Sequence, residues 1–272
     1  MIVVAGATGN VGREVVRHLV EAGEPVRALT RDPGKAGSPG VTAVAGDLTD
    51  PSSLVPAFAD ATALFLLSGY SPEIFTVARE AGVRRVALLS GGSAETGDRS
   101  NAVARYMIET EEALRASGLA WTVVRPRMFM TNALQWADQL KAGVVRAPWP
   151  DVPSAVVDPA DIAAVAAKAL RSADHEGREY AVTGPEALRP GERVRILAEV
   201  LGRDIRYEPQ PDDEARAEMT AQMPVEYVDA FFDFYSGGKL DEATVFPTVE
   251  EVTGRPPRTF AEWVRANAGR FS

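Results

Sequence analysis

Residues 1–12 of this 272-residue chain read MIVVAGATGNVG. Four apolar residues, 2–5, precede glycines at positions 6, 9 and 12, and valines and a leucine then follow at helical spacing along 11–20. This order predicts a buried strand, a glycine-rich turn and the N-terminus of a helix. Such a turn binds nucleotide phosphates, because the backbone amides of the helix N-terminus point at the ligand. We therefore expect a dinucleotide site here.

Each glycine of this turn has its own expected role. Gly6 permits the tight turn, Gly9 lets a pyrophosphate approach the backbone, and Gly12 lets the helix lie close to the strand. Three glycines alone occur in many turns, but their position after an N-terminal strand favours a dinucleotide site. The same turn is expected to bring three more residues to the cofactor: Thr8, Asn10 and Val11.

Strand and helix patterns alternate through the first 125 residues, which is typical of βαβ units and a parallel sheet. The expected fold class is therefore α/β, a Rossmann-like doubly wound parallel sheet with a small, mostly helical C-terminal substrate lobe. Helices are expected at 72–81 and 105–116. Strands are expected at 2–5, 25–30, 41–45, 63–67, 85–89 and 121–125.

The pattern changes after Pro126, where prolines break up an irregular stretch. A helix is expected at 160–170 and another strand of the main sheet at 180–183. We interpret Asp158 and Asp161 as the start of that helix and a complement to its dipole, not as catalytic carboxylates.

The expected domain division follows from these patterns. An NADP-binding Rossmann domain is expected at 1–150, with 155–184 returning to it, and a substrate lobe at 185–272. Within the lobe, helical or extended pieces are expected at 195–201, 204–207 and 259–266.

Composition limits the classes of function. The chain has no cysteine, which excludes disulfides, thiolate nucleophiles and cysteine-ligated metals. Its two histidines, His18 and His175, fall in separate segments, so we expect neither a metal site nor a Ser-His-Asp triad. A net charge of −9 argues against nucleic acid as a partner. No apolar run is long enough to cross a bilayer, and the N-terminal strand leaves no room for a signal peptide, so we expect a cytoplasmic protein. We also expect a monomer or a homodimer that acts on a small molecule.

The end of the second strand indicates which nicotinamide cofactor is bound. An NAD site would place an acidic residue there for the ribose hydroxyl, whereas this strand ends in Thr30-Arg31. Arg31 can bind a 2′-phosphate, although Asp32 beside it could neutralise its charge. NADP(H) is therefore favoured. Further cofactor contacts are expected after the third and fourth strands, at Asp47, Leu48, Ser68 and Gly69.

These features together resemble the NmrA-like atypical short-chain dehydrogenase/reductases, a group that includes NADPH-dependent quinone and triphenylmethane-dye reductases. The resemblance covers essentially the whole chain. It implies that residues 126–131 lie beside the nicotinamide, with Pro126, Met128 and Phe129 in contact with it and Met130 in the same apolar wall. The matching segments are GATGNVG at 6–12, TR at 30–31, AGDL at 45–48, ETE at 109–111, SGLAWTVVRP at 117–126 and TGRPPRTF at 253–260.

The chain departs from the superfamily at its usual proton donor, a Tyr with a Lys four residues later. Tyr106 is followed four positions on by Thr110, so the pair is absent there. The position at which relatives carry a helix Lys or His is Met107, and Val103 stands where the superfamily Tyr would lie. Neither side chain can donate a useful proton.

Three interpretations follow. In the first, an NADPH-dependent reductase transfers hydride to a quinone, enone or azo acceptor whose product takes its proton from water. In the second, Tyr106 or Ser90 is the catalytic proton donor. In the third, the protein is a non-catalytic NADP(H)-binding redox sensor, as the fungal regulator NmrA is. A pathway-specific isomerase, or other chemistry with a retained nicotinamide, is a further alternative. The first interpretation is favoured.

Overall fold

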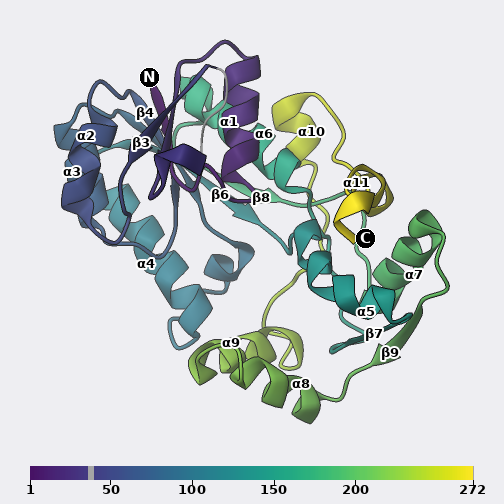
Figure 1. Cartoon of the computed structure of the whole chain (residues 1–272). Helices are drawn as coiled ribbons and strands as arrows, with labels where there is room; N and C mark the ends of the chain where they lie inside the picture. The colour runs from purple at the N-terminus through teal and green to yellow at the C-terminus, as the bar shows by residue number, and fades with distance from the viewer. Residues whose placement is uncertain (36–39, 272) are drawn as a thin grey trace.

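The structure is a computed structural model that describes residues 1–35 and 40–271. In this part of the chain a seven-stranded parallel sheet has the order β3-β2-β1-β4-β5-β6-β8 (Figure 1). The chain moves outward from β1 to β3 and then returns to β4 on the other side of β1, which places a ligand crevice at the carboxyl ends of β1 and β4. The strands are β1 Ile2–Val4, β2 Val26–Thr30, β3 Val41–Ala45, β4 Ala63–Leu67, β5 Arg85–Leu89, β6 Ala120–Pro126 and β8 Arg178–Val182.

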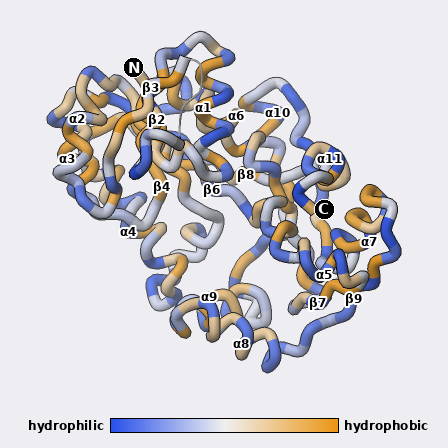
Figure 2. Tube along the Cα trace, viewed as in Figure 1, coloured by the Kyte–Doolittle hydropathy of each residue, from blue (hydrophilic) through white to orange (hydrophobic). Residues whose placement is uncertain are grey.

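Helices cover both faces of this sheet (Figure 1). One face packs against α1 Gly12–Glu21, α6 Pro159–Arg171 and α10 Thr248–Thr253, and the other against α2 Val55–Phe58, α3 Glu73–Glu80 and α4 Ala102–Ala116. The strands lie between these layers as mostly apolar segments (Figure 2). The apolar stripe of α1 packs inward as its spacing predicts, because Val15 and Leu19 are fully buried. The predicted doubly wound Rossmann-like fold is confirmed.

A second group of elements lies beyond the carboxyl ends of the strands (Figure 1). Strands β7 Val144–Ala147 and β9 Arg206–Pro209 form a small parallel sheet. Around it lie α5 Ala137–Lys141, α7 Pro190–Leu201 and α11 Phe260–Ala266, which share a core that includes Trp136, Phe260 and Trp263. Helices α8 Asp212–Thr220 and α9 Val225–Tyr235 complete this group.

The small sheet takes β7 from before residue 150 and β9 from after it, while α10 packs on the main sheet. The division into a domain at 1–150 with 155–184 and a lobe at 185–272 stays a prediction. Short 3-10 segments connect the elements at Pro33–Lys35, Pro51–Leu54, Gly92–Thr96, Met130–Trp136 and Ala173–His175, and another follows α11 at Ala268–Phe271. None of the helices in residues 1–35 and 40–271 is both long enough and apolar enough to cross a bilayer.

The start of α4 differs from the sequence-based expectation for a local reason. This helix begins at Ala102 instead of 105, because Asn101 Oδ1 accepts hydrogen bonds of 3.1 Å from the amides of Val103 and Ala104. Asn101 is thus an N-cap that the apolar pattern did not reveal.

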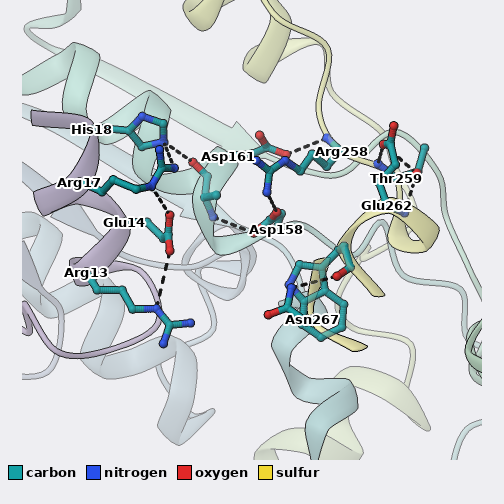
Figure 3. A network of polar contacts seen from close by, with 12 residues as sticks. Arg13, Glu14, Arg17, His18, Asp158, Asp161, Arg258, Thr259, Glu262 and Asn267 are labelled. Atoms are coloured by element: carbon teal, nitrogen blue, oxygen red, sulfur yellow. Dashed lines mark hydrogen bonds and ion pairs between the residues drawn. The ribbon is translucent and has the colours of Figure 1, made fainter. Parts of the chain in front are cut away.

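The two aspartates at the start of α6 have structural roles, as expected (Figure 3). Asp158 caps the helix by accepting the amide of Ala160 at 2.8 Å. Its second oxygen binds the guanidinium of Arg258 at 3.1 Å, and Asp161 accepts the amide of Arg258 at 2.8 Å. These contacts hold the segment around Arg258, just before α11, against the start of α6.

Candidate functional site

The glycine turn has the geometry that its sequence predicts. Gly6 has φ +60°, a conformation that favours glycine, and its carbonyl accepts the amide of Gly9 at 2.8 Å. A Cβ atom on Gly12 would lie 2.1 Å from the Gly6 carbonyl oxygen, so a larger residue would displace the helix. Val11 precedes α1 without a side-chain cap, which leaves the positive end of the helix dipole facing the turn. These residues form a suitable cradle for a pyrophosphate.

A cavity of about 550 Å³ lies beside this turn, at the carboxyl ends of β1 to β4. Five of the predicted cofactor residues line it together: Gly6, Thr8, Arg31, Asp47 and Leu48. Tyr70 lines it too, although nothing in the sequence pattern singled it out. The volume and the polar walls are suited to the adenosine half of a dinucleotide.

The charged residues that line this cavity are Arg31, Asp32 and Asp47. Arg31 is exposed at the cavity wall. Asp47 accepts the amide and the hydroxyl of Thr49 at 2.9 and 2.8 Å, and these bonds, with a smaller effect from Arg31, lower the pKa of its carboxyl. The carboxylate of Asp32 accepts the amide of Gly34 at 3.2 Å.

The loop after β4 connects the cofactor crevice to α4. The amide of Gly69 donates to the hydroxyl of Thr110 at 3.1 Å, and that hydroxyl donates to the carbonyl of Tyr106 at 2.7 Å. Gly69 has φ +94°, and a Cβ there would meet the Tyr106 ring at 3.4 Å. The hydroxyl of Ser68 is buried without a hydrogen-bond partner among the described residues.

Ser90, one of the two candidate proton donors, is buried in an ionic network. Its hydroxyl donates to Glu111 Oε1 at 2.7 Å, and Arg125 binds both oxygens of that carboxylate at 2.9 and 2.6 Å. Arg115 adds a bond of 2.8 Å. Burial opposes ionisation of Glu111, but these bonds outweigh it and lower its pKa. The sequence motif contained Glu111 and Arg125 without revealing that they pair.

The other candidate donor, Tyr106, lies half-buried in an apolar cluster with Ala230 and Phe234 of α9. Burial raises the pKa of its phenol, which makes it a weaker acid than an exposed tyrosine. Met107 accepts the hydroxyl of Ser93 at 3.0 Å and packs on Gly91, where an added Cβ would lie 2.9 Å from the methionine side chain. Met107 therefore packs against Ser93 and Gly91.

A second cavity, of about 410 Å³, lies between the end of β6 and the smaller group of elements. Met128 lines it, whereas Pro126 and Met130 are buried and Phe129 packs on the core of the main domain. The four residues were expected together beside the nicotinamide, and Met128 alone among them reaches the wall of this cavity. Its other walls carry aromatic rings and side-chain amides, including Trp136, Trp149, Gln135, Gln139 and Gln222.

Two buried charges near β6 had no sequence signal. Glu242 accepts the amide of Met128 at 2.8 Å, and burial raises its pKa to about 7. Arg127 binds Glu95 at 2.6 Å and lies over the ring of Phe246, at 5.5 Å from the ring centroid. Glu242 comes from the loop after α9, so only the folded chain brings it to β6.

Comparison with known proteins decides the family. A match to the NAD(P)H-binding family covers residues 6–173, which include the glycine turn and the cavity beside it. The chain belongs to the NAD(P)H-binding family. A relative from Streptomyces griseus subsp. griseus, (4-alkanoyl-5-oxo-2,5-dihydrofuran-3-yl)methyl phosphate reductase, is 43% identical over 100% of this chain and 99% of its own length. The NAD(P)H azoreductase of Xenophilus azovorans is 37% identical over 100% and 99%.

Solved structures of other proteins share the fold. The NADPH-dependent quinone oxidoreductase QOR2 of Escherichia coli, crystallised with NADPH, has a TM-score of 0.82 at 27% identity and covers 98% of this chain and 100% of its own. A mutant NmrA structure has a TM-score of 0.76 at 19% identity, which shows a common fold. The predicted resemblance to NAD(P)H-dependent reductases is confirmed.

Proposed function

We propose that the protein is an NADPH-dependent reductase that passes hydride to a small conjugated or azo acceptor. The observation that supports this most is that both cavities lie beyond the carboxyl ends of the strands of the main sheet. The first contains predicted dinucleotide residues, and the second begins at Met128 and has aromatic, amide and charged side chains on its walls. Three relatives are named as reductases of a furanone phosphate, an azo compound and a quinone. Their names support the same reaction class.

The choice of NADPH over NADH follows from Arg31. Its exposed guanidinium lines the 550 Å³ cavity, where it can form charge-assisted hydrogen bonds to a ribose 2′-phosphate. Gly6, Thr8, Gly9, Asn10, Val11 and Gly12 would hold the pyrophosphate at the start of α1. Ser68 and Gly69 would contact the ribose beside the nicotinamide, because they follow β4 next to β1.

When bound, NADPH supplies the hydride. The protein would orient the acceptor against the wall at Met128, and the aromatic rings of the 410 Å³ cavity would pack on it. Two electrons enter the acceptor with the hydride, and a proton from water completes the reduction. A quinone thus gives a hydroquinone, and an azo group gives a hydrazo group. No side-chain acid is required for such acceptors, which agrees with the apolar Val103 and Met107.

The partner we propose is therefore a small molecule, and we expect a monomer or a homodimer. The decisive experiment offers NADPH together with 1,4-benzoquinone, menadione or an azo dye. Oxidation of NADPH is followed by the loss of the absorbance of reduced nicotinamide at about 340 nm. Turnover with at least one acceptor is expected. Tight NADPH binding without turnover on any of them would instead favour a redox sensor.

A further inference from the structure

The guanidinium of Arg193 on α7 is a buried charge that the proposed reaction does not use. The residue is only 5% exposed, yet it lines the 410 Å³ cavity. A buried arginine is expensive unless a partner compensates its charge, so its partners need to be identified.

The groups that contact the Arg193 guanidinium are weak hydrogen-bond acceptors. Nη1 donates to the sulfur of Met128 at 3.1 Å, and the guanidinium carbon lies 5.2 Å from the ring centroid of Trp136. Its Nε is buried without a hydrogen-bond partner within residues 1–35 and 40–271, and no ion pair to Arg193 forms there. Arg127 is equally buried, but it binds the carboxylate of Glu95 at 2.6 Å. Arg193 therefore lacks the counter-ion that its neighbour has.

Burial lowers the pKa of Arg193 to about 10, so the group still carries its charge at neutral pH. Among the surrounding titratable groups Glu242 favours the charged form of Arg193, but no ion pair between the two forms among the described residues. Glu242 lies nearby, but it accepts the Met128 amide and its own pKa is raised to about 7, while Tyr207 and Tyr235 are neutral at that pH. An anion in the cavity would complete the coordination of Arg193.

The rest of the cavity is suited to an extended, conjugated body. Met128, Trp136 and Phe231 give apolar walls, and the amides of Gln135 and Gln139 can donate or accept hydrogen bonds. Of the charged residues on the wall, Arg146 is exposed and already binds Glu214 at 2.6 Å, and Glu218 is an acid. Arg193 is thus the cation without a carboxylate partner on this wall.

We propose that the acceptor carries an oxyanion group, a phosphate monoester, sulfonate or carboxylate, and that Arg193 binds it inside the 410 Å³ cavity. This inference rests on the proposed reductase function and specifies its substrate class. Arg193 is a specificity-determining residue, because it selects anionic acceptors over neutral ones of the same shape.

A matched pair of azo dyes tests this proposal: 4-dimethylaminoazobenzene and its 4′-sulfonate, methyl orange. The variant Arg193→Met removes the charge and keeps an unbranched, although shorter, side chain. Wild type should favour the sulfonate in kcat/KM, and the variant should lose that preference by about tenfold or more, since hydrogen bonds between charged groups have that magnitude. The variant should lose at least about tenfold less kcat/KM on the neutral dye than on the sulfonate. An equal loss on both dyes would show a merely structural arginine and overturn the proposal.

The matched control is Arg195→Met, on the same helix, where an exposed arginine binds Glu199 at 2.7 Å. It should leave the preference unchanged. Phenyl phosphate, benzenesulfonate and benzoate, tested as competitive inhibitors of the neutral dye, distinguish the oxyanion classes. Wild type should be inhibited by at least one of them and Arg193→Met by none, whereas equal inhibition of both proteins would place the anion elsewhere.

Binding measurements separate this proposal from the proposed function. Methyl orange is titrated into the protein saturated with NADP⁺, which permits binding but no reduction. Weaker binding to Arg193→Met supports the oxyanion site even if no dye is ever reduced, while unchanged binding overturns it even if reduction occurs. Failure of NADPH oxidation with every acceptor would contradict the reductase function alone.

Discussion

The hydroxyl of Ser90 donates a 2.7 Å hydrogen bond to Glu111, a carboxylate that Arg125 also binds through both oxygens. A serine whose proton is directed at a buried carboxylate is poorly placed to protonate a substrate. We expect Ser90→Ala to lower the free energy of unfolding by about 1.5–3 kcal/mol, the usual value of a hydrogen bond to a charged group, and to leave kcat within about threefold. Urea denaturation and steady-state NADPH oxidation measure the two effects.

Tyr106 allows the companion prediction for the proton donor. Its ring packs near Gly69 and in the cluster with α9, so we expect Tyr106→Phe to preserve packing and kcat within about threefold. Met107→Leu, at the neighbouring packing position, should also have near wild-type activity. A hundredfold drop in kcat for Tyr106→Phe, with unchanged stability, would instead identify the phenol as the proton donor.

Gly12→Ala tests the close approach of α1 to the turn. Its Cβ would lie 2.1 Å from the Gly6 carbonyl oxygen and 2.6 Å from the carbonyl carbon, both backbone atoms that cannot rotate away. We expect a loss of about 1–3 kcal/mol or more in unfolding free energy and at least tenfold weaker NADPH binding, since the helix N-terminus must shift. Gly269→Ala is the matched control, because a Cβ there meets nothing within 4 Å. Unchanged NADPH affinity in Gly12→Ala would remove the turn from the site.

Most of the fold could be predicted because its signals are local. The strands at 41–45, 63–67 and 85–89 were delimited correctly by apolar runs between polar turns, and the glycine turn fixed where the first crossover begins. Element ends were less accurate where a side chain decided them. Asn101 extends α4 by its N-cap bonds, and Glu192 accepts the amide of Arg189, which helps α7 begin at Pro190 instead of 195.

Only part of the candidate site could be predicted from the sequence, for a physical reason. The cofactor residues follow consecutive strands, so their strand-end position revealed them before any contact was known. Glu242 and Arg193 belong to distant segments and approach Met128 only after the chain has folded. A single glutamate or arginine in a helical lobe has no spacing that distinguishes a buried charge from a solvated one.

Arg31→Ala tests the cofactor preference. Arg31 lines the 550 Å³ cavity at the end of β2, and a guanidinium bound to a 2′-phosphate adds about 1.5–3 kcal/mol that NADH cannot obtain. We expect at least tenfold weaker NADPH binding and unchanged NADH binding, measured by fluorescence titration at low ionic strength. Equal losses for both cofactors would contradict the 2′-phosphate contact.

Glu242 should make stability depend on pH in the direction opposite to a salt-bridged carboxylate. Its folded pKa, about 7, lies above the ordinary 4.5, so the folded protein binds this proton more tightly than the unfolded chain. The contribution is complete below about pH 4.5 and is lost as the pH rises through 7, with a total on the order of 3 kcal/mol. Glu242→Gln keeps an acceptor for the Met128 amide without this titration, so its stability relative to wild type should increase from pH 5 to about pH 8. Thermal unfolding of both proteins across that range, with the exposed Glu250→Gln as control, measures the difference, and parallel curves for wild type and Glu242→Gln would contradict the assignment.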